Sequence, residues 1–238
     1  MPQKFGIRSQ PVMLCLLIIA AVIVAQVANA GDPGLTRSHI LVGTDTSGSQ
    51  QWNGGNFTAV TQNINSYWSS TNNSRFALRS MWLEVDQKNG SWIENGFMDG
   101  ALNNSYHHGF YTAFGHIEGN TLTYGEYKII GPSTANGTRH KYEITYVGNN
   151  TYAVVVDGTI YKKFVGFYPG GSYMNIGLET NYQGSYWATN YTSNHNRKDG
   201  NGTWSAWQSG VKKIKDSLGT GYTCVWTTYP TAAKYYHP

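Results

Sequence analysis

The sequence predicts an all-β protein with one antiparallel β-sandwich domain of the jelly-roll type, preceded by an N-terminal signal peptide. Helical periodicity is almost absent after residue 30, and short runs of alternating apolar and polar residues take its place. Clusters of Gly, Asn and Asp separate these runs at intervals of about 8–12 residues, which is typical of a sandwich. No internal repeat or low-complexity linker divides the chain, so we expect a single domain over residues 51–238.

The first 30 residues have the layout of a secretory signal peptide. Lys4 and Arg8 precede an apolar run, Val12–Ala25, and the small-x-small pattern Ala28–Ala30 follows just before Gly31. The alternative is an uncleaved membrane anchor, because the run is close to the lower limit for spanning a bilayer. We expect cleavage, secretion, no remaining membrane segment, and a polar lead-in over residues 31–50.

The first expected strands form a hairpin. Ser80–Asp86 alternates with Met81, Leu83 and Val85 on one face, and Ser91–Phe97 is the returning strand. Asn89-Gly90 lies between them and is a strong hairpin signal, since both residues tolerate positive φ. A longer aromatic strand follows at Tyr106–Ile117.

The middle of the chain continues as a series of strands. Thr121–Ile130 contains Gly125, where we expect a β-bulge. Arg139–Val147 alternates with a period of two, and Tyr152–Val156 is apolar and β-branched, which favours a central position in a sheet. Asp157-Gly158 is the second hairpin signal.

The last third of the sequence is less regular. We expect strands at Ile160–Phe167 and Ser172–Asn181, separated by a Pro-Gly-Gly break. Residues 183–203 are polar and predict a long loop. Trp204–Ile214 and Gly221–Tyr229 are expected to supply closing strands.

Charge excludes some classes of partner. The formal net charge of +4 falls by two when Lys4 and Arg8 are removed with the signal. The densest basic cluster, Lys212, Lys213 and Lys215, is explained by a solvated face, so no nucleic-acid partner is expected. A polypeptide or a glycan is the expected partner, and the oligomeric state stays open.

The sequence predicts neither a metal site nor a cofactor. His-x-His and Cys-x-x-Cys patterns are absent. His108 and His116 share one face of an expected strand but lie about 26 Å apart along it. Cys224 would be the single cysteine after signal cleavage, so no internal disulfide is expected.

Sequons for N-glycosylation are frequent, and most fall where turns are expected. They are surface acceptors if the host glycosylates exported proteins, or chance matches in an Asn- and Thr-rich chain. The eight sequons begin at Asn56, Asn72, Asn89, Asn103, Asn136, Asn149, Asn190 and Asn201.

Two strands carry a glutamate with a glycine two residues away. Glu94 is followed by Gly96, and Glu179 is preceded by Gly177. Because side chains alternate along a strand, each glycine shares the face of its glutamate and should leave a gap beside it. The apolar neighbours point the other way, so both glutamates are expected on the face opposite the core.

Two carboxylates that converge on this face could act as a general acid and a general base on a water molecule. Glu94 and Glu179 are therefore the candidate catalytic residues, with activity expected at acidic pH. Candidate substrate-binding residues are Trp92, Asn175, Tyr182 and Trp187. The alternative is that both glutamates are simply solvent-exposed strand residues.

Several segments resemble the neprosin-type glutamic peptidase domain. That family has an aromatic-Gly entry strand, a Ser-x-Ile-Trp strand, an Ile-Glu-Ala-Gly-Trp strand, a Gly-rich strand that ends in an aromatic-Pro step, and a Glu-Trp-Gly-Gly-Glu segment. The similar segments here are Trp52–Val60, Arg79–Val85, Trp92–Phe97, Gly158–Pro169 and Asn175–Glu179.

The resemblance implies a concanavalin-like β-sandwich with two catalytic glutamates, which would correspond to Glu94 and Glu179. The chain departs from the family pattern in several places. Asn95 and Phe97 replace Ala and Trp in one motif, and Asn175 and Ile176 replace Glu and Trp in the other. The family's cysteine pair and long activation segment are absent. These departures bear on activity more than on fold.

Two non-catalytic functions are the alternatives. The first is a lectin-like sandwich whose aromatic residues stack on sugar rings, although aromatics are also common in strands and cores. The second is a cell-surface structural protein that assembles through its strand edges. The aromatic candidates for sugar stacking are Trp68, Trp92, Trp187, Trp204, Trp207, Tyr182 and Tyr186.

Overall fold

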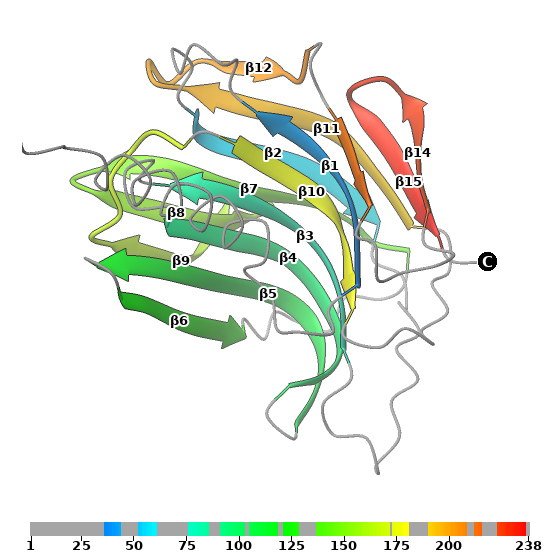
Figure 1. Cartoon of the computed structure of the whole chain (residues 1–238), viewed down its shortest axis with the longest axis horizontal. Coiled ribbons are helices and arrows are strands. Elements are labelled where there is room, and N and C mark those ends of the chain that lie inside the picture. Colours follow the sequence, from blue (N-terminus) through cyan, green and yellow to red (C-terminus); the bar gives the residue numbers. More distant parts are fainter. Residues whose placement is uncertain are drawn as a thin grey trace, which may run out of the picture. The chain divides into compact units, whose positions relative to one another are not determined.

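The protein is an antiparallel β-sandwich, as predicted (Figure 1). The computed structural model describes residues 36–43, 52–60, 76–85, 91–102, 105–118, 121–128, 137–171, 173–180, 190–208, 212–215 and 223–236. All strand pairings among these residues are antiparallel, and no helix occurs among them. None of the described segments is an apolar helix of membrane-spanning length.

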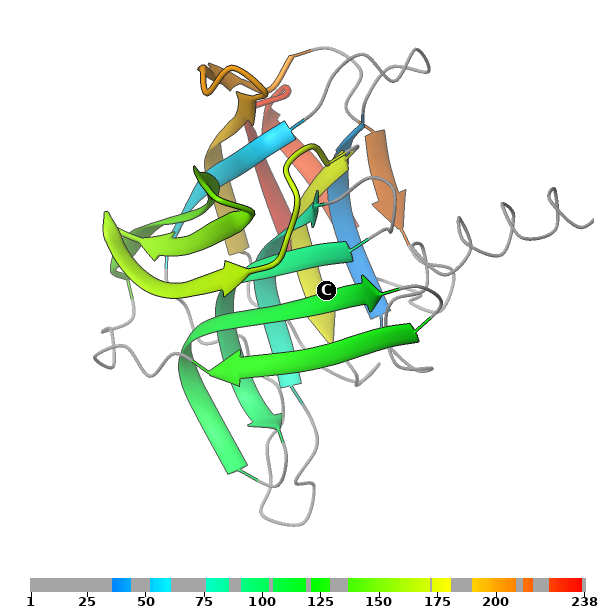
Figure 2. The same cartoon turned by 90° about the vertical axis from the view of Figure 1, so that its left-hand side faces the viewer.

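The strands form two sheets. In spatial order, the seven-stranded sheet contains β13 (Lys212–Lys215), β1 (Thr36–Gly43), β10 (Tyr173–Thr180), β3 (Phe76–Val85), β4 (Ser91–Leu102), β5 (Ser105–Glu118) and β6 (Thr121–Lys128). The hairpin of β5 and β6, green in Figure 2, lies at one edge of this sheet.

The eight-stranded sheet provides the second layer. In spatial order it contains β14 (Thr223–Thr228), β15 (Ala232–Tyr236), β11 (Asn190–Asp199), β2 (Trp52–Val60), β7 (Arg139–Gly148), β8 (Thr151–Val156) and β9 (Thr159–Val165), with β12 (Trp204–Ala206) paired to β11.

Both hairpin signals lie between paired strands. β3 and β4 pair antiparallel in continuous register from Phe76 to Val85, on either side of Asn89-Gly90. Between β8 and β9, Asp157 has φ 50° and Gly158 has φ 81°. Two consecutive positive φ values match a type I′ turn, whose twist suits a two-residue hairpin.

The core lies between the sheets and follows from the period-two patterns. Each strand turns alternate side chains toward the opposite sheet, and these are apolar in β3, β4, β8 and β10. Core residues of these strands are Met81, Leu83, Val85, Ile93, Phe97, Tyr152, Val154, Val156, Met174, Ile176 and Leu178.

One polar side chain joins the layers across this core. Asn95 of β4 is fully buried, and its Nδ2 donates to the carbonyl oxygens of Glu143 at 3.0 Å and Val155 at 3.1 Å. Both acceptors belong to the eight-stranded sheet. Asn95 therefore connects β4 to β7 and β8 by hydrogen bonds that an apolar residue could not make.

The structure differs from the sequence-based expectation at residues 183–203. Part of this segment, Asn190–Asp199, is strand β11, between β2 and β15. Asn190, Thr192 and His195 are its buried side chains, so polar residues occupy positions that apolar ones usually take. The alternation was therefore not visible as a hydrophobic pattern.

Other strands were also missed or misjudged. β1 lies within the expected polar lead-in and pairs with β10, and β15 follows the last expected strand. The β-bulge expected at Gly125 is absent, because β5 and β6 stay in register around the Phe114–Gly125 pair. A Cβ at Gly125 would come within 2.5 Å of the Phe114 ring, so this glycine accommodates an aromatic side chain.

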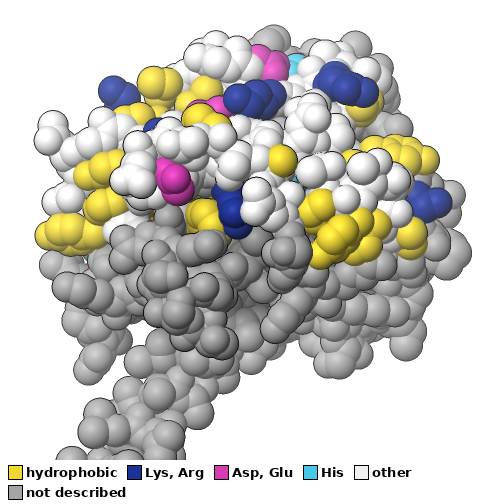
Figure 3. Space-filling view, turned by 90° about the horizontal axis from the view of Figure 1, so that it is seen from above, with side chains coloured by type: hydrophobic (Ala, Val, Ile, Leu, Met, Phe, Trp, Pro, Cys, Tyr) yellow, Lys and Arg dark blue, Asp and Glu magenta, His cyan; other side chains and the backbone are white. Residues whose placement is uncertain are grey.

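The described surface carries both charged and hydrophobic side chains, with Val165 and Tyr168 among the exposed hydrophobic residues. In Figure 3, Lys and Arg side chains lie scattered among acidic, hydrophobic and neutral ones on the face shown. Of the sequon asparagines, Asn149 and Asn201 lie exposed in turns, whereas Asn56 and Asn190 are buried within strands. The remaining four, Asn72, Asn89, Asn103 and Asn136, fall outside the described residues.

Candidate active site

Glu94 and Glu179 lie on the same face of the seven-stranded sheet, opposite the core. Their strand neighbours Ile93 and Leu178 belong to the core cluster, and side chains alternate along each strand. We call this surface the site face; from β3, β4 and β10 it carries Ser80, Trp82, Glu84, Trp92, Glu94, Gly96, Asn175, Gly177 and Glu179.

The strands that carry the two glutamates are not neighbours. β3 lies between β4 and β10. In the register, Glu94 pairs with Trp82, whereas Glu179 pairs with Leu78, so the two glutamates are four residues apart along the sheet. Two strand spacings and four residue rises separate their Cα atoms by about 16 Å on a flat sheet.

Ser80 occupies the midpoint between the two glutamates. It pairs with Gly96 on one side and with Gly177 on the other. Glu94 and Glu179 are therefore both diagonal neighbours of Ser80, each about 7–8 Å away between Cα atoms. Side chains that lean toward Ser80 from the two outer strands converge over the middle strand.

Glu94 leans in this direction. The Ser80 hydroxyl donates a short hydrogen bond to Glu94 Oε1, and both residues are buried. From β5, the Thr112 hydroxyl donates to the backbone carbonyl of Glu94 at 2.6 Å. The bond from Ser80 holds the Glu94 carboxyl group above β3 rather than above its own strand, whereas the bond from Thr112 ties the Glu94 backbone to β5.

The gap expected beside Glu94 is not present at Gly96. A Cβ added there would lie 2.1 Å from the Arg79 carbonyl oxygen and 2.7 Å from Ser80 Cβ. The missing side chain thus allows β3 to approach β4 closely. Its effect is to place Ser80 within reach of Glu94, and not to open a space.

Asn175 lies in the same row as Glu94. Both pair with Trp82, from opposite sides of β3, and Asn175 is buried. It is also the diagonal neighbour of Ser80 on the side away from Glu179. On this face of β10, the side chains of Asn175 and Glu179 therefore lie on either side of Gly177.

Trp92 forms an aromatic wall next to Glu94. Its ring stacks on Trp82, with centroids 5.9 Å apart and planes at 30°. A Cβ at Gly115 would meet the Trp92 indole at 2.4 Å, so the indole lies over that glycine. Trp92 is only 7% exposed. The other two expected binding residues, Tyr182 and Trp187, lie outside the described residues.

The sequence reasoning did not single out Ser80 or Glu84. Glu84 is buried, pairs with Trp92 and is a diagonal neighbour of Glu94, which makes it a second carboxylate on the site face. The sequence pattern could have identified both residues. Met81, Leu83 and Val85 were predicted to point into the core. Because side chains alternate along a strand, Ser80, Trp82 and Glu84 must then lie on the other face.

Titratable groups elsewhere form pairs rather than metal clusters. His140 Nδ1 lies 2.5 Å from Asp157 Oδ2, and Asp99 Oδ1 accepts from the Tyr106 hydroxyl at 2.7 Å. In the described part of the chain, no three His, Cys, Asp or Glu side chains are arranged to hold a metal ion.

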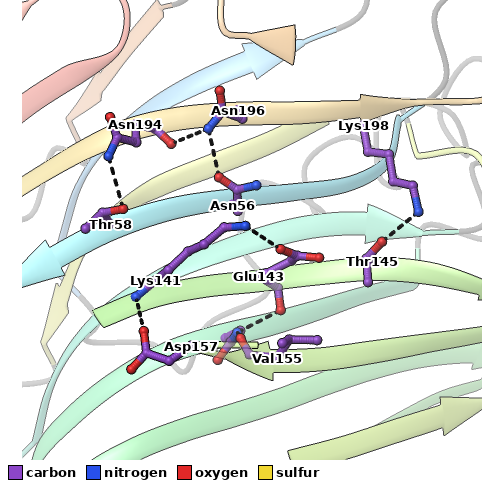
Figure 4. Close-up of polar contacts among 11 residues, drawn as sticks. Asn56, Thr58, Lys141, Glu143, Thr145, Val155, Asp157, Asn194, Asn196 and Lys198 are labelled. Atoms are coloured by element: carbon purple, nitrogen blue, oxygen red, sulfur yellow. Dashed lines mark hydrogen bonds and ion pairs between the residues drawn. The ribbon is translucent and has the colours of Figure 1, made fainter. Parts of the chain in front are cut away.

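The face of the eight-stranded sheet that points away from the core carries ordinary polar contacts (Figure 4). Lys141 Nζ and Glu143 Oε2 are 2.9 Å apart, and Lys198 Nζ donates to Thr145 Oγ1 at 2.9 Å. Asn196 Nδ2 donates to Asn56 Oδ1 at 2.9 Å. Glu143 is thus a strand glutamate in a surface ion pair, and it serves as a comparison for Glu94.

Comparison with known proteins supports the fold. No protein-family model and no curated protein matches the sequence. The chain is structurally similar to scytalido-glutamic peptidase bound to a transition-state analogue inhibitor, with a TM-score of 0.55 and 9% identity over 86% of this chain and 98% of that one. A second structure of that peptidase, with a peptide-based transition-state analogue, gives 0.53 and 9% over the same shares.

A toad ovary galectin in complex with thio-digalactose is more distant. Its TM-score is 0.36, with 10% identity over 60% of this chain and 98% of that one. At 9% identity, the glutamic peptidases show the fold alone. The chain has a β-sandwich fold distantly similar to that of glutamic peptidases.

Proposed function

We propose that this protein is a glutamic peptidase-like hydrolase in which Glu94 and Glu179 act on a water molecule bound over Ser80. The observation that carries the proposal is the position of Ser80, which is a diagonal neighbour of both glutamates and already binds the Glu94 carboxylate. The distant similarity to glutamic peptidases supports it.

The proposed chemistry requires the Glu94 and Glu179 carboxyl groups to converge over Ser80, which lies diagonally between them in the sheet. Two close carboxylates do not both ionise freely, so one holds a proton while the other is charged. The charged carboxylate takes a proton from water as the water attacks the scissile carbonyl carbon. The protonated carboxyl donates to the carbonyl oxygen or to the leaving amine. The requirement for one shared proton favours acidic pH.

Asn175 is suited to positioning the substrate. Its amide lies in the same row as Glu94 and can both donate and accept hydrogen bonds, which a peptide backbone requires. Trp92 lies on the side of Glu94 away from Ser80, and it stacks on Trp82, which pairs with Glu94 from β3, to form an apolar wall. In the full proposal, Tyr182 and Trp187 contribute further contacts from the chain segment that follows β10.

The finer assignment within the proposal is a neprosin-type peptidase that is exported from the cell. It rests on the similar motifs Arg79–Val85 and Trp92–Phe97, and on the signal-like first 30 residues. N-terminal sequencing of the protein recovered from the culture medium tests the export step. A mature chain that begins at Gly31 supports cleavage, and an intact Met1 contradicts it.

Sugar binding through Trp92 is less favoured. One face of its ring stacks on Trp82, the indole also covers Gly115, and little of it is exposed. Trp207, another expected sugar-stacking residue, is 1% exposed and packs against His195 in the core. A glycan array still separates the two hypotheses, because specific binding lost in Trp92→Ala but kept in Glu179→Gln would favour a lectin.

The direct test is a cleavage assay on unfolded protein substrates from pH 2 to 7. Wild type should cleave at acidic pH, and Glu94→Gln and Glu179→Gln should each lose about 100-fold or more of kcat/KM. Glu143→Gln removes a glutamate of the surface ion pair and should retain activity. Equal rates for wild type and Glu94→Gln on every substrate would reject the catalytic proposal.

A further inference from the structure

A buried arginine crosses the sandwich core without an acidic partner. Arg79 projects from β3 on the core face and is fully buried. Its Nη1 donates to the Val60 carbonyl oxygen at 2.5 Å and to Asn190 Oδ1 at 2.8 Å, and its guanidinium lies 5.9 Å from the centre of the Phe97 ring. Among the described residues, its contacts are thus with neutral groups.

The remaining donors of Arg79 lie along one edge of the guanidinium. Nε and Nη2 are both buried and make no hydrogen bond in the described structure. These two N–H groups point in the same direction and form the fork that binds carboxylates and other anions with two parallel hydrogen bonds. The edge that is best suited to an anion is therefore the unused one.

A third unused donor lies nearby. The Tyr142 hydroxyl of β7 is buried and faces Arg79, from which its oxygen can accept a hydrogen bond, and its O–H finds no acceptor among the described residues. Burial raises the pKa of Tyr142 to about 12, so the phenol is neutral at physiological pH and does not balance the charge of Arg79. Tyr235 is occupied, because its hydroxyl donates to the Ile176 carbonyl oxygen at 3.0 Å.

We propose that Arg79 Nε and Nη2, together with the Tyr142 hydroxyl, form an internal binding site for a small monovalent anion such as chloride. An isolated positive charge in a protein interior is costly unless it is paired. A water molecule would satisfy the hydrogen bonds but would leave the charge unbalanced. A halide satisfies both requirements and needs no donors of its own.

The site is separate from the candidate catalytic residues. Arg79 and Ser80 are consecutive in β3, so their side chains lie on opposite faces of the sheet. The anion would lie between the two layers and would tie β3 to β7. Its expected role is to stabilise the packing of the sheets, and the inference holds whether or not the protein is a peptidase.

The first test is the thermal unfolding midpoint at constant ionic strength, with sodium chloride replaced by sodium gluconate. Chloride at ten times its Kd should raise the Tm of wild type by roughly 3–5 °C, with saturation. Arg79→Met should lose this dependence, and Tyr142→Phe should weaken it. If Arg79→Met does not fold, the comparison rests on Tyr142→Phe and on wild type.

The second test locates the ion directly. Crystals of wild type soaked in bromide should show an anomalous peak within about 3.5 Å of Arg79 Nε and Nη2. Equal Tm values in chloride and gluconate, with no anomalous peak at this edge, would overturn the proposal and assign the position to water.

Discussion

The Ser80 hydroxyl donates a hydrogen bond to the Glu94 carboxylate across the β3–β4 hairpin. This contact moves the carboxylate toward the middle strand, halfway to Glu179. It depends on Gly96, whose lack of a side chain lets β3 and β4 approach. A catalytic glutamate would thus be positioned by a serine and a glycine that do not themselves react.

Ser80→Ala tests this positioning role. The loss of one hydrogen bond to a carboxylate should cost about 1.5–3 kcal/mol of interaction and should reduce kcat more than KM. Ser80→Thr keeps the hydroxyl and should restore part of the activity. Ser193→Ala, in β11 of the other sheet, is the matched control. If the rate of cleavage by Ser80→Ala depends on pH in the same way as that of wild type, Ser80 does not position the Glu94 carboxyl group.

Gly96→Ala should destabilise the fold by about 1–3 kcal/mol, because the new Cβ overlaps the backbone of β3. Gly200→Ala is the control, since a Cβ at Gly200 meets nothing within 4 Å. Urea unfolding of both variants measures the difference. Equal midpoints would mean that the strands do not approach as closely as described.

Asn95→Asp should destabilise the sandwich more at neutral pH than at low pH. The amide donates to two carbonyl oxygens of the opposite sheet, and an ionised carboxylate would face them without a donor. Protonation of the aspartate restores one donor. The exposed Asn201→Asp should show no such effect. Chemical unfolding at pH 4 and pH 7 checks the pattern, which a pH-independent loss would contradict.

Acid should weaken the fold through His195. Burial lowers its pKa to about 4, from an ordinary value of 6.5. Below pH 6.5 the unfolded chain therefore binds a proton that the folded protein does not. The contribution of neutral His195 to the free energy of unfolding is fully present above pH 6.5. It falls by about 3 kcal/mol as the pH drops toward 4.

His195→Gln isolates this contribution. Its stability should vary less between pH 6.5 and 4 than that of wild type. The measurement is the free energy of unfolding at several pH values. If both proteins respond alike, His195 is not the residue responsible. The same measurement gives the pH range over which the protein stays folded, and cleavage at acidic pH is assayed within that range.

Local patterns predicted much of the fold. The alternation in Ser80–Asp86 and Ser91–Phe97, with Asn89-Gly90 between them, predicted the hairpin that presents Glu94. Asp157-Gly158 likewise predicted its turn, and a period of two assigned both glutamates to the face opposite the core.

What the sequence did not reveal is non-local. The position of β3 between β4 and β10 depends on pairing between residues 91 to 103 positions apart, from Leu83–Met174 to Ala77–Thr180, which no short pattern encodes. For this reason Ser80 could not be recognised as the midpoint between the glutamates. Strand β11 was taken for a loop because its buried positions hold Asn190, Thr192 and His195, whose contacts come from tertiary structure.

The central claim is that Glu94 and Glu179 act as one unit, and a double-mutant cycle on acidic peptide hydrolysis tests it most directly. We predict that Glu94→Gln, Glu179→Gln and the double variant lose similar amounts of kcat/KM, because removal of either carboxyl ends the shared chemistry. Losses that simply multiply in the double variant, or no acidic cleavage by wild type, would contradict the account.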